Sequence, residues 1–170
     1  MRVYFQRYLA WAEFSVFAND FAHYWKVYGG SLALLKSPAS LLAALMSLLA
    51  LLTGRLEFWS LGALASLPAL LGFSLGAMAI VLAFPTTSMF KVLAEEGRED
   101  SYYIDLASKF VHFILFQTAG LMYTLVIPAK FLLLLDLVGF WLLTYAVLMG
   151  LVVAVSLFGT ARLYNHPGSH

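Results

Sequence analysis

The sequence predicts an all-α integral membrane protein: a four-helix bundle preceded by an N-terminal interfacial helix and assembled as a homo-oligomer. Hydrophobic residues make up 62% of the 170 positions and charged residues 11%, so polar surface is too scarce to cover a water-soluble globule. Apolar stretches long enough to cross ~30 Å of hydrocarbon recur along the chain. Small residues repeat within them at helical spacing, which is typical of helices that pack closely in lipid.

Residues 1–30 are expected to form an amphipathic aromatic helix. One face carries residues at alternating intervals of three and four, namely Trp11, Phe14, Ala18, Phe21, Trp25 and Tyr28. Aromatic rings on one face suit the headgroup zone of a bilayer. Packing of the same face against the bundle would produce the same pattern, so both interpretations stay open. Gly29-Gly30 is expected to end the helix.

Four spans are expected within a transmembrane domain of residues 31–167: about 38–53, 61–84, 110–128 and 131–158. The first is short for a span, and the second holds no charge. Because only the short turn from Ile127 to Lys130 separates the last two spans, they are expected to form an antiparallel hairpin. Its register places Asp136 beside Tyr123 and His112 beside Ala146.

The connector 85–109 is expected to lie in the cytoplasm and to contain a short helix over about 88–96. Asp100 or Ser101 is expected to cap the helix that follows. Asp105 and Lys109 stand four residues apart, which is the spacing of an ion pair on one helix face.

The basic residues predict the orientation of the chain. With the N-terminus inside, one side holds Arg2, Arg7, Lys26, Lys36, Lys91, Arg98, Lys109 and Arg162, and the other holds only Arg55 and Lys130. An excess of Lys and Arg marks the cytoplasmic side. Both termini are therefore expected in the cytoplasm, and the protein in a bacterial inner membrane. Residues 168–170 are interpreted as a tag remnant.

Small residues form seams along the expected spans. The second span carries Gly62, Ala65, Ala69, Gly72, Gly76 and Ala79, and the fourth carries Gly139 and Gly150. Such seams allow helix backbones to approach closely in lipid. They predict either contacts between copies of the chain or packing of the spans within one copy.

Polar residues inside the apolar spans are the candidates for a functional site. Asp136 is the strongest, because a carboxylate within a span is costly unless it faces the bundle interior, faces water or is protonated. It either lines a cation path or is a structural carboxylate bonded to Tyr123 or Lys130. Gln117 and Thr124 share a face of the third span, with His112 at its inner end, and such side chains either bond a neighbouring helix or line water.

Several classes of function lose support from the sequence. The net charge of +1 and the scattered basic residues argue against binding of double-stranded nucleic acid. The histidines share no ligand spacing, so no metal site is expected, and no cofactor motif occurs. Gly72 to Gly76 match GxSxG, but a nucleophile elbow requires a strand-to-helix turn, whereas these residues lie within a helical span. No enzyme activity is therefore expected.

The predicted function is an oligomeric membrane channel, or a membrane-permeabilising effector, gated from the cytoplasmic side. In the channel, the polar residues of the third and fourth spans would line the path. The alternative is a non-conducting scaffold or binding subunit, in which the acidic connector and the N-terminal helix recruit a cytosolic partner. Co-purification with such a partner would favour the alternative.

In size and span count the whole chain resembles the small multi-span effectors of bacterial anti-phage defence, Hailong-type proteins among them. That resemblance implies a resting channel that is released to depolarise the cell through a cytosolic, nucleotide-derived regulator. Residues 24–84 also resemble bacterial bestrophins in Tyr24-Trp25, in the GGS at Gly29 to Ser31 and in the segment LLGFSLGAMAIVLAF. Bestrophins are much longer and continue into an arginine-bearing segment, so no residue role is carried over from them.

Overall fold

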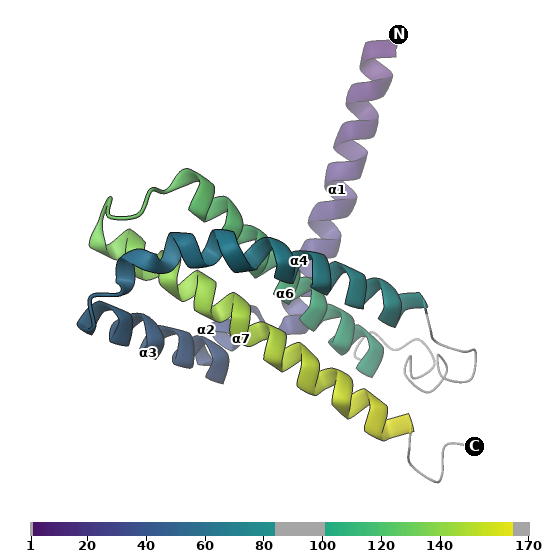
Figure 1. Ribbon diagram of the computed structural model, residues 1–170. Helices are drawn as coiled ribbons and strands as arrows, with labels where there is room; N and C mark the ends of the chain where they lie inside the picture. Colours follow the sequence, from purple (N-terminus) through teal and green to yellow (C-terminus); the bar gives the residue numbers. More distant parts are fainter. Residues whose placement is uncertain (1, 84–100, 165–170) are drawn as a thin grey trace.

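The computed structural model describes residues 2–83 and 101–164, and within those ranges all regular secondary structure is helical. Figure 1 shows the elements in chain order: α1 (Arg2–Tyr28), α2 (Gly30–Lys36), α3 (Pro38–Leu52), the 3₁₀ turn η1 (Leu56–Phe58), α4 (Trp59–Ala83), α6 (Tyr102–Val126) and α7 (Leu133–Tyr164). The predicted all-α class is confirmed. The helix predicted over about 88–96 lies outside the described residues.

Local sequence signals account for the breaks between the first helices. α1 ends at Tyr28 because Gly29 adopts a φ of 99°, a left-handed conformation that glycine enters without steric cost. The predicted stop is confirmed, although α2 begins directly at Gly30. Ser37 then caps α3 by accepting a hydrogen bond from the backbone N–H of Ser40, with Pro38 in the first helical turn. α2 and α3 bend by 53° at this break.

Three helices are long and apolar enough to cross a membrane: Leu56–Ala83 (η1 with α4), α6 and Leu133–Thr160 of α7. They correspond to the second, third and fourth predicted spans. The first predicted span coincides with α3, whose 15 residues extend only about 22 Å at 1.5 Å per residue. A fourth span therefore exists only if α2 and α3 are counted together as one bent span.

The predicted hairpin of α6 and α7 has the expected register. The hydroxyl of Tyr123 donates to the carbonyl oxygen of Leu135 at 2.9 Å, and His112 lies 2.7 Å from the hydroxyl of Tyr145, one residue from the expected neighbour. α4, α6 and α7 pack on one another, and α3 lies along α7. The larger buried cluster includes Phe110 and Met149. At the start of α6, the predicted ion pair between Lys109 and Asp105 forms at 2.6 Å.

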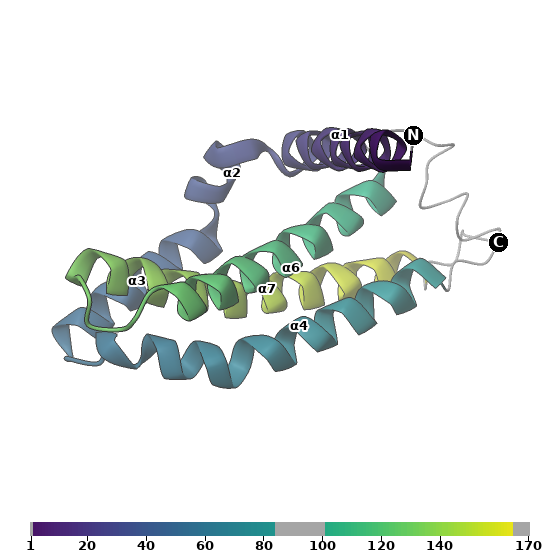
Figure 2. The ribbon, with the colours of Figure 1, turned by 90° about the horizontal axis from the view of Figure 1, so that it is seen from above.

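α1 runs steeply across the bundle and leaves it at one side (Figure 1), and it lies at the edge of the bundle next to α6 (Figure 2). Its only buried side chain among those described is Tyr24, which lies against α6. Phe14 and Phe21 of the predicted stripe are exposed. Packing on the chain's own bundle therefore explains the C-terminal end of the stripe, whereas both interpretations stay open for the rest of it.

The glycines of the predicted seams divide into two groups. A side chain at Gly139 would meet the Trp59 ring at 2.6 Å, and one at Gly150 would meet Phe113 at 3.1 Å, so these glycines admit neighbours within the same chain. Gly62 similarly admits Leu143. By contrast, the rest of the α4 seam is exposed and faces away from α6 and α7; it comprises Ala65, Ala69, Gly72, Gly76 and Ala79. We call these five residues the α4 small-residue face.

Candidate functional site: polar clusters inside the bundle

Asp136 lies at the end of the bundle where the turn joins α6 to α7. It lies in the first turn of α7, where the helix dipole stabilises a negative charge, and it is only 6% exposed. One carboxylate oxygen, Oδ1, accepts a hydrogen bond from the indole Nε1 of Trp59 at 2.7 Å. The backbone N–H of Lys130 donates to both carboxylate oxygens, at 3.1 and 3.2 Å. Two donors and a helix terminus thus compensate a charge that would otherwise be costly at this depth.

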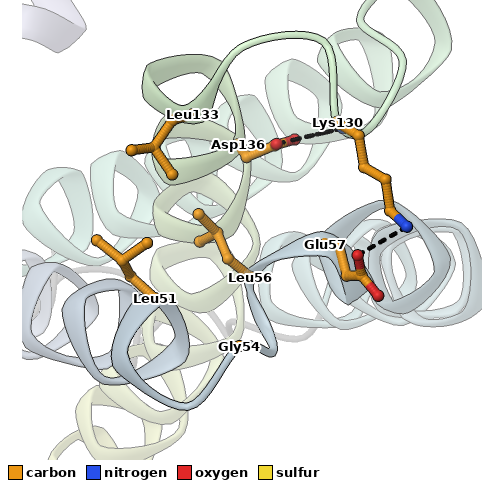
Figure 3. Close-up of a pocket in the computed structure, with 7 residues that line it drawn as sticks. All are labelled: Leu51, Gly54, Leu56, Glu57, Lys130, Leu133 and Asp136. Carbon is orange, nitrogen blue, oxygen red and sulfur yellow. Dashed lines mark hydrogen bonds and ion pairs between the residues drawn. The ribbon is translucent and has the colours of Figure 1, made fainter.

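The partners of Asp136 differ in part from those that the sequence predicted. Lys130 bonds it through the main chain, because its φ of 67° turns the N–H toward the carboxylate. The ammonium group instead pairs with Glu57 at 2.7 Å (Figure 3). This hydrogen bond raises the pKa of Lys130. The Tyr123 hydroxyl bonds the backbone of Leu135. Sequence reasoning did not identify Trp59, which is 77 positions from Asp136.

A small pocket of about 280 Å³ opens beside Asp136. Three leucines line one part of it, and the Glu57–Lys130 pair lies on the other side in Figure 3; the full lining is Leu51, Gly54, Leu56, Glu57, Lys130, Leu133 and Asp136. The carboxylate of Asp136 turns toward the Lys130 backbone, so its charge is held by the turn.

Gln117 occupies the middle of the bundle and is fully buried. Its Oε1 lies 2.9 Å from the hydroxyl of Ser74 on α4, and that hydroxyl also lies 3.0 Å from the carbonyl oxygen of Leu71. The amide nitrogen Nε2 has no hydrogen-bond partner in the part of the chain that the structure describes. One unpaired buried polar group costs about 1–3 kcal/mol. Thr124, one turn beyond Gly120, bonds the carbonyl oxygen of Gly120 in its own helix.

His112 forms a cluster with three tyrosines. Both of its ring nitrogens are engaged: Nδ1 lies 2.6 Å from the hydroxyl of Tyr24, and Nε2 lies 2.7 Å from the hydroxyl of Tyr145. The ring of Tyr28 stacks on the imidazole with centroids 3.6 Å apart, and the Tyr28 hydroxyl lies 3.2 Å from that of Tyr145. Burial raises the pKa of Tyr24, so its hydroxyl keeps its proton. We call these four residues the His112 cluster; it joins α1 to α6 and α7.

The candidate residues therefore lie at three levels along one helix pair. Asp136 and Tyr123 are near the turn between α6 and α7, Gln117 is in the middle, and His112 is nearer the opposite end of the pair. Apolar rings such as Phe116 lie against the His112 cluster. Ser74, His112 and Asp136 each bond different partners, so the GxSxG segment is not joined to a base or an acid. Among the described residues no three His, Asp or Glu side chains gather as a metal site would require.

Comparison with known proteins adds no relative. No family model, curated protein or solved structure matches this chain. The resemblances drawn from the sequence therefore stay predictions, and the function of the protein has to be inferred from its own residues.

Proposed function

We propose that this protein is the subunit of an oligomeric membrane channel that is gated from its cytoplasmic side. One observation carries the proposal: an apolar bundle with three membrane-length helices buries Asp136, Gln117 and His112 at successive levels. Polar side chains at membrane depth mark conduction paths and helix contacts. Gln117, with one buried nitrogen unpaired among the described residues, favours a role beyond packing.

The path in this proposal follows the polar side of α6. In the closed form the polar groups bond one another and the adjoining backbone. A shift of α6 against α4 would separate Ser74 from Gln117 and let water bond the freed groups. Asp136 would then place a negative charge at the outer end, which would attract cations. The His112 cluster is the link through which α1 would hold α6 in the closed position.

Assembly in this proposal uses the α4 small-residue face. Lipid tails are as apolar as leucine, so spans associate where small residues admit a neighbouring backbone. Within the described residues, a side chain at Gly72 or Gly76 would meet nothing within 4 Å. The rest of the arrangement belongs to the same proposal: α2 and α3 form a bent first span, both termini lie in the cytoplasm, and the membrane is a bacterial inner membrane.

Cation flux into liposomes that contain the purified protein tests the channel. We expect a flux in the wild type, and a lower preference for cations over anions in Asp136→Asn, which keeps an oxygen for the Trp59 indole but removes the charge. Glu57→Gln is the matched control, because Glu57 is an outer carboxylate paired with Lys130. Absence of any flux, together with a monomeric mass in detergent, would reject the proposal.

A non-conducting scaffold subunit is the rival function. The exposed aromatic face of α1 favours it, because large exposed apolar patches mark interaction surfaces. A cytosolic protein that co-purifies at fixed stoichiometry, and whose binding is lost in Phe17→Ala, would support the scaffold. A flux that needs no added protein would favour the channel.

A further inference from the structure

α1 extends past the bundle that holds it. Tyr24 and Tyr28 contact α6 through His112, whereas every residue from Glu13 to Ala22 is exposed. Phe17 is 63% exposed and lies seven residues before Tyr24, on the same face of the helix. The face that covers α6 therefore continues as an uncovered aromatic face. We call residues 13–22 the arm.

The arm is arranged as a ready contact surface. The ring of Phe21 stacks on that of Phe17 at 6.2 Å and on that of Trp25 at 6.3 Å. Stacked rings restrict one another's motion, so these side chains would lose little conformational entropy when a partner bound them. The stacked rings run unbroken from the open arm into the part of α1 that contacts α6, so a helix beside α6 would continue that contact along the arm.

The α4 small-residue face lies partly at the depth of the arm. Ser74 of α4 bonds Gln117 of α6, and the two helices run in opposite directions. His112, which holds α1, lies five residues from Gln117, and Ala79 lies five residues from Ser74. Both steps cover about 7.5 Å toward the same end of the bundle. Ala79 is therefore level with the crossing point of α1, and Gly76 is within one helix diameter of it.

We propose that the arm of each copy lies across Gly76 and Ala79 of a second copy in a two-fold pair. α1 and α4 lie on opposite faces of α6 (Figure 2). A two-fold axis parallel to the spans leaves every depth unchanged and turns the α4 small-residue face of one copy toward the arm of the other. The contact is then reciprocal, as a closed two-fold interface requires. The pair rests on the oligomer proposed above and names one of its contacts.

The spacing of the arm fits this neighbour. Packed helices lie about 8–10 Å apart, and the seven residues from Tyr24 to Phe17 cover about 10.5 Å of α1. A helix placed next to α6 would thus meet α1 at Phe17. There the α4 small-residue face offers room, since nothing in the described structure lies within 4 Å of a side chain at Gly76. Large rings on one side and glycine and alanine on the other are complementary in shape.

Disulfide trapping in native membranes tests the pair, because the chain has no cysteine of its own. Phe17→Cys carrying one tag and Ala79→Cys carrying another are co-expressed and oxidised. We expect a cross-linked dimer that bears both tags, since a disulfide needs Cα atoms within about 7 Å. Two matched controls should give none. Ala65→Cys lies on the same face about 21 Å further along α4, and Asn19→Cys lies on the opposite side of α1 from Phe17.

The outcomes separate this contact from the channel proposal. If the protein is oligomeric by mass but the Phe17–Ala79 pair cross-links no better than the controls, the contact is wrong and the assembly remains. If a spin label at position 17 reports lipid contact in that oligomer, the arm lies in the headgroup zone instead, which also overturns the contact. If the protein is monomeric in membranes and in detergent, both proposals fail.

Discussion

Replacing Gly139 with alanine should destabilise the protein, although alanine favours helices. The added methyl would lie 2.6–2.7 Å from three ring atoms of Trp59, and Trp59 is one of the two donors that bond the Asp136 carboxylate. Because Trp59 is almost wholly buried, its ring cannot move away without displacing other core side chains. The clash is therefore expected to weaken the hydrogen bond as well as the packing.

The magnitude is the sum of three contributions. Overpacking a core costs about 1–3 kcal/mol, and loss of a hydrogen bond to a charged group costs about 1.5–3 kcal/mol. The higher helix propensity of alanine over glycine offsets ~1 kcal/mol of this destabilisation. If about half of the hydrogen-bond energy is lost, the three contributions lower the free energy of unfolding of Gly139→Ala by about 1–4 kcal/mol.

Unfolding in mixed micelles of rising SDS content, followed by circular dichroism, measures the effect. Gly72→Ala is the matched control, since the described structure places nothing within 4 Å of its new methyl, and it should be neutral or slightly stabilising. In a Trp59→Ala background the destabilisation by Gly139→Ala should vanish, because the ring that the methyl would clash with is absent. The effects of substitutions at contacting residues are not additive. Equal stability of Gly139→Ala and the wild type would refute the packing described for this site.

Three further predictions concern α1 and the turn between α6 and α7. Tyr24→Phe leaves a ring nitrogen of His112 unpaired and should destabilise the α1 contact by about 1–3 kcal/mol, seen as faster proteolysis of α1 in detergent; unchanged proteolysis would refute the role of this bond. Gly29→Ala forces alanine into a φ of 99° and should cost about 1–2 kcal/mol, whereas Gly29→Asn should cost less in the same SDS unfolding assay. Because its pairing with Glu57 raises the pKa of Lys130 above its usual 10.5, the stability from this pair should be complete below that pH and be lost as pH rises through the raised pKa. The difference between wild type and Glu57→Gln should therefore shrink in strong alkali, and a constant difference would contradict the pairing.

Much of the local architecture is set by short-range signals. Gly29 and Ser37-Pro38 define helix ends through backbone geometry, and these constraints act within a few residues. The hairpin register could be predicted from the short turn at Lys130, since a tight connection leaves two antiparallel helices little freedom to slide. That is why the levels of Asp136 and His112 could be predicted without a structure. The shortness of α3 was likewise visible in the chain.

The partners of those polar residues could not be predicted in the same way. Trp59 and Asp136 are 77 positions apart, and Ser74 and Gln117 are 43 apart, so no periodicity relates either pair. The sequence alone does not specify which hydrogen-bond donor the packing of the helices brings to the carboxylate of Asp136. Only the three-dimensional arrangement of α4 against α6 and α7 selects the indole as its donor.

The sequence by itself determined that this is a membrane protein, because a chain so poor in charged residues cannot cover its core with polar surface. It also determined the helices and most of their ends. Only the tertiary structure decided which face of each helix turns inward. In a membrane both the core and the lipid are apolar, so hydropathy does not distinguish the buried face of α4 from the exposed one. The inward face is selected by side-chain shape and by the hydrogen bonds of a few polar groups. In α4 that selection leaves the small-residue face exposed on the surface of the bundle.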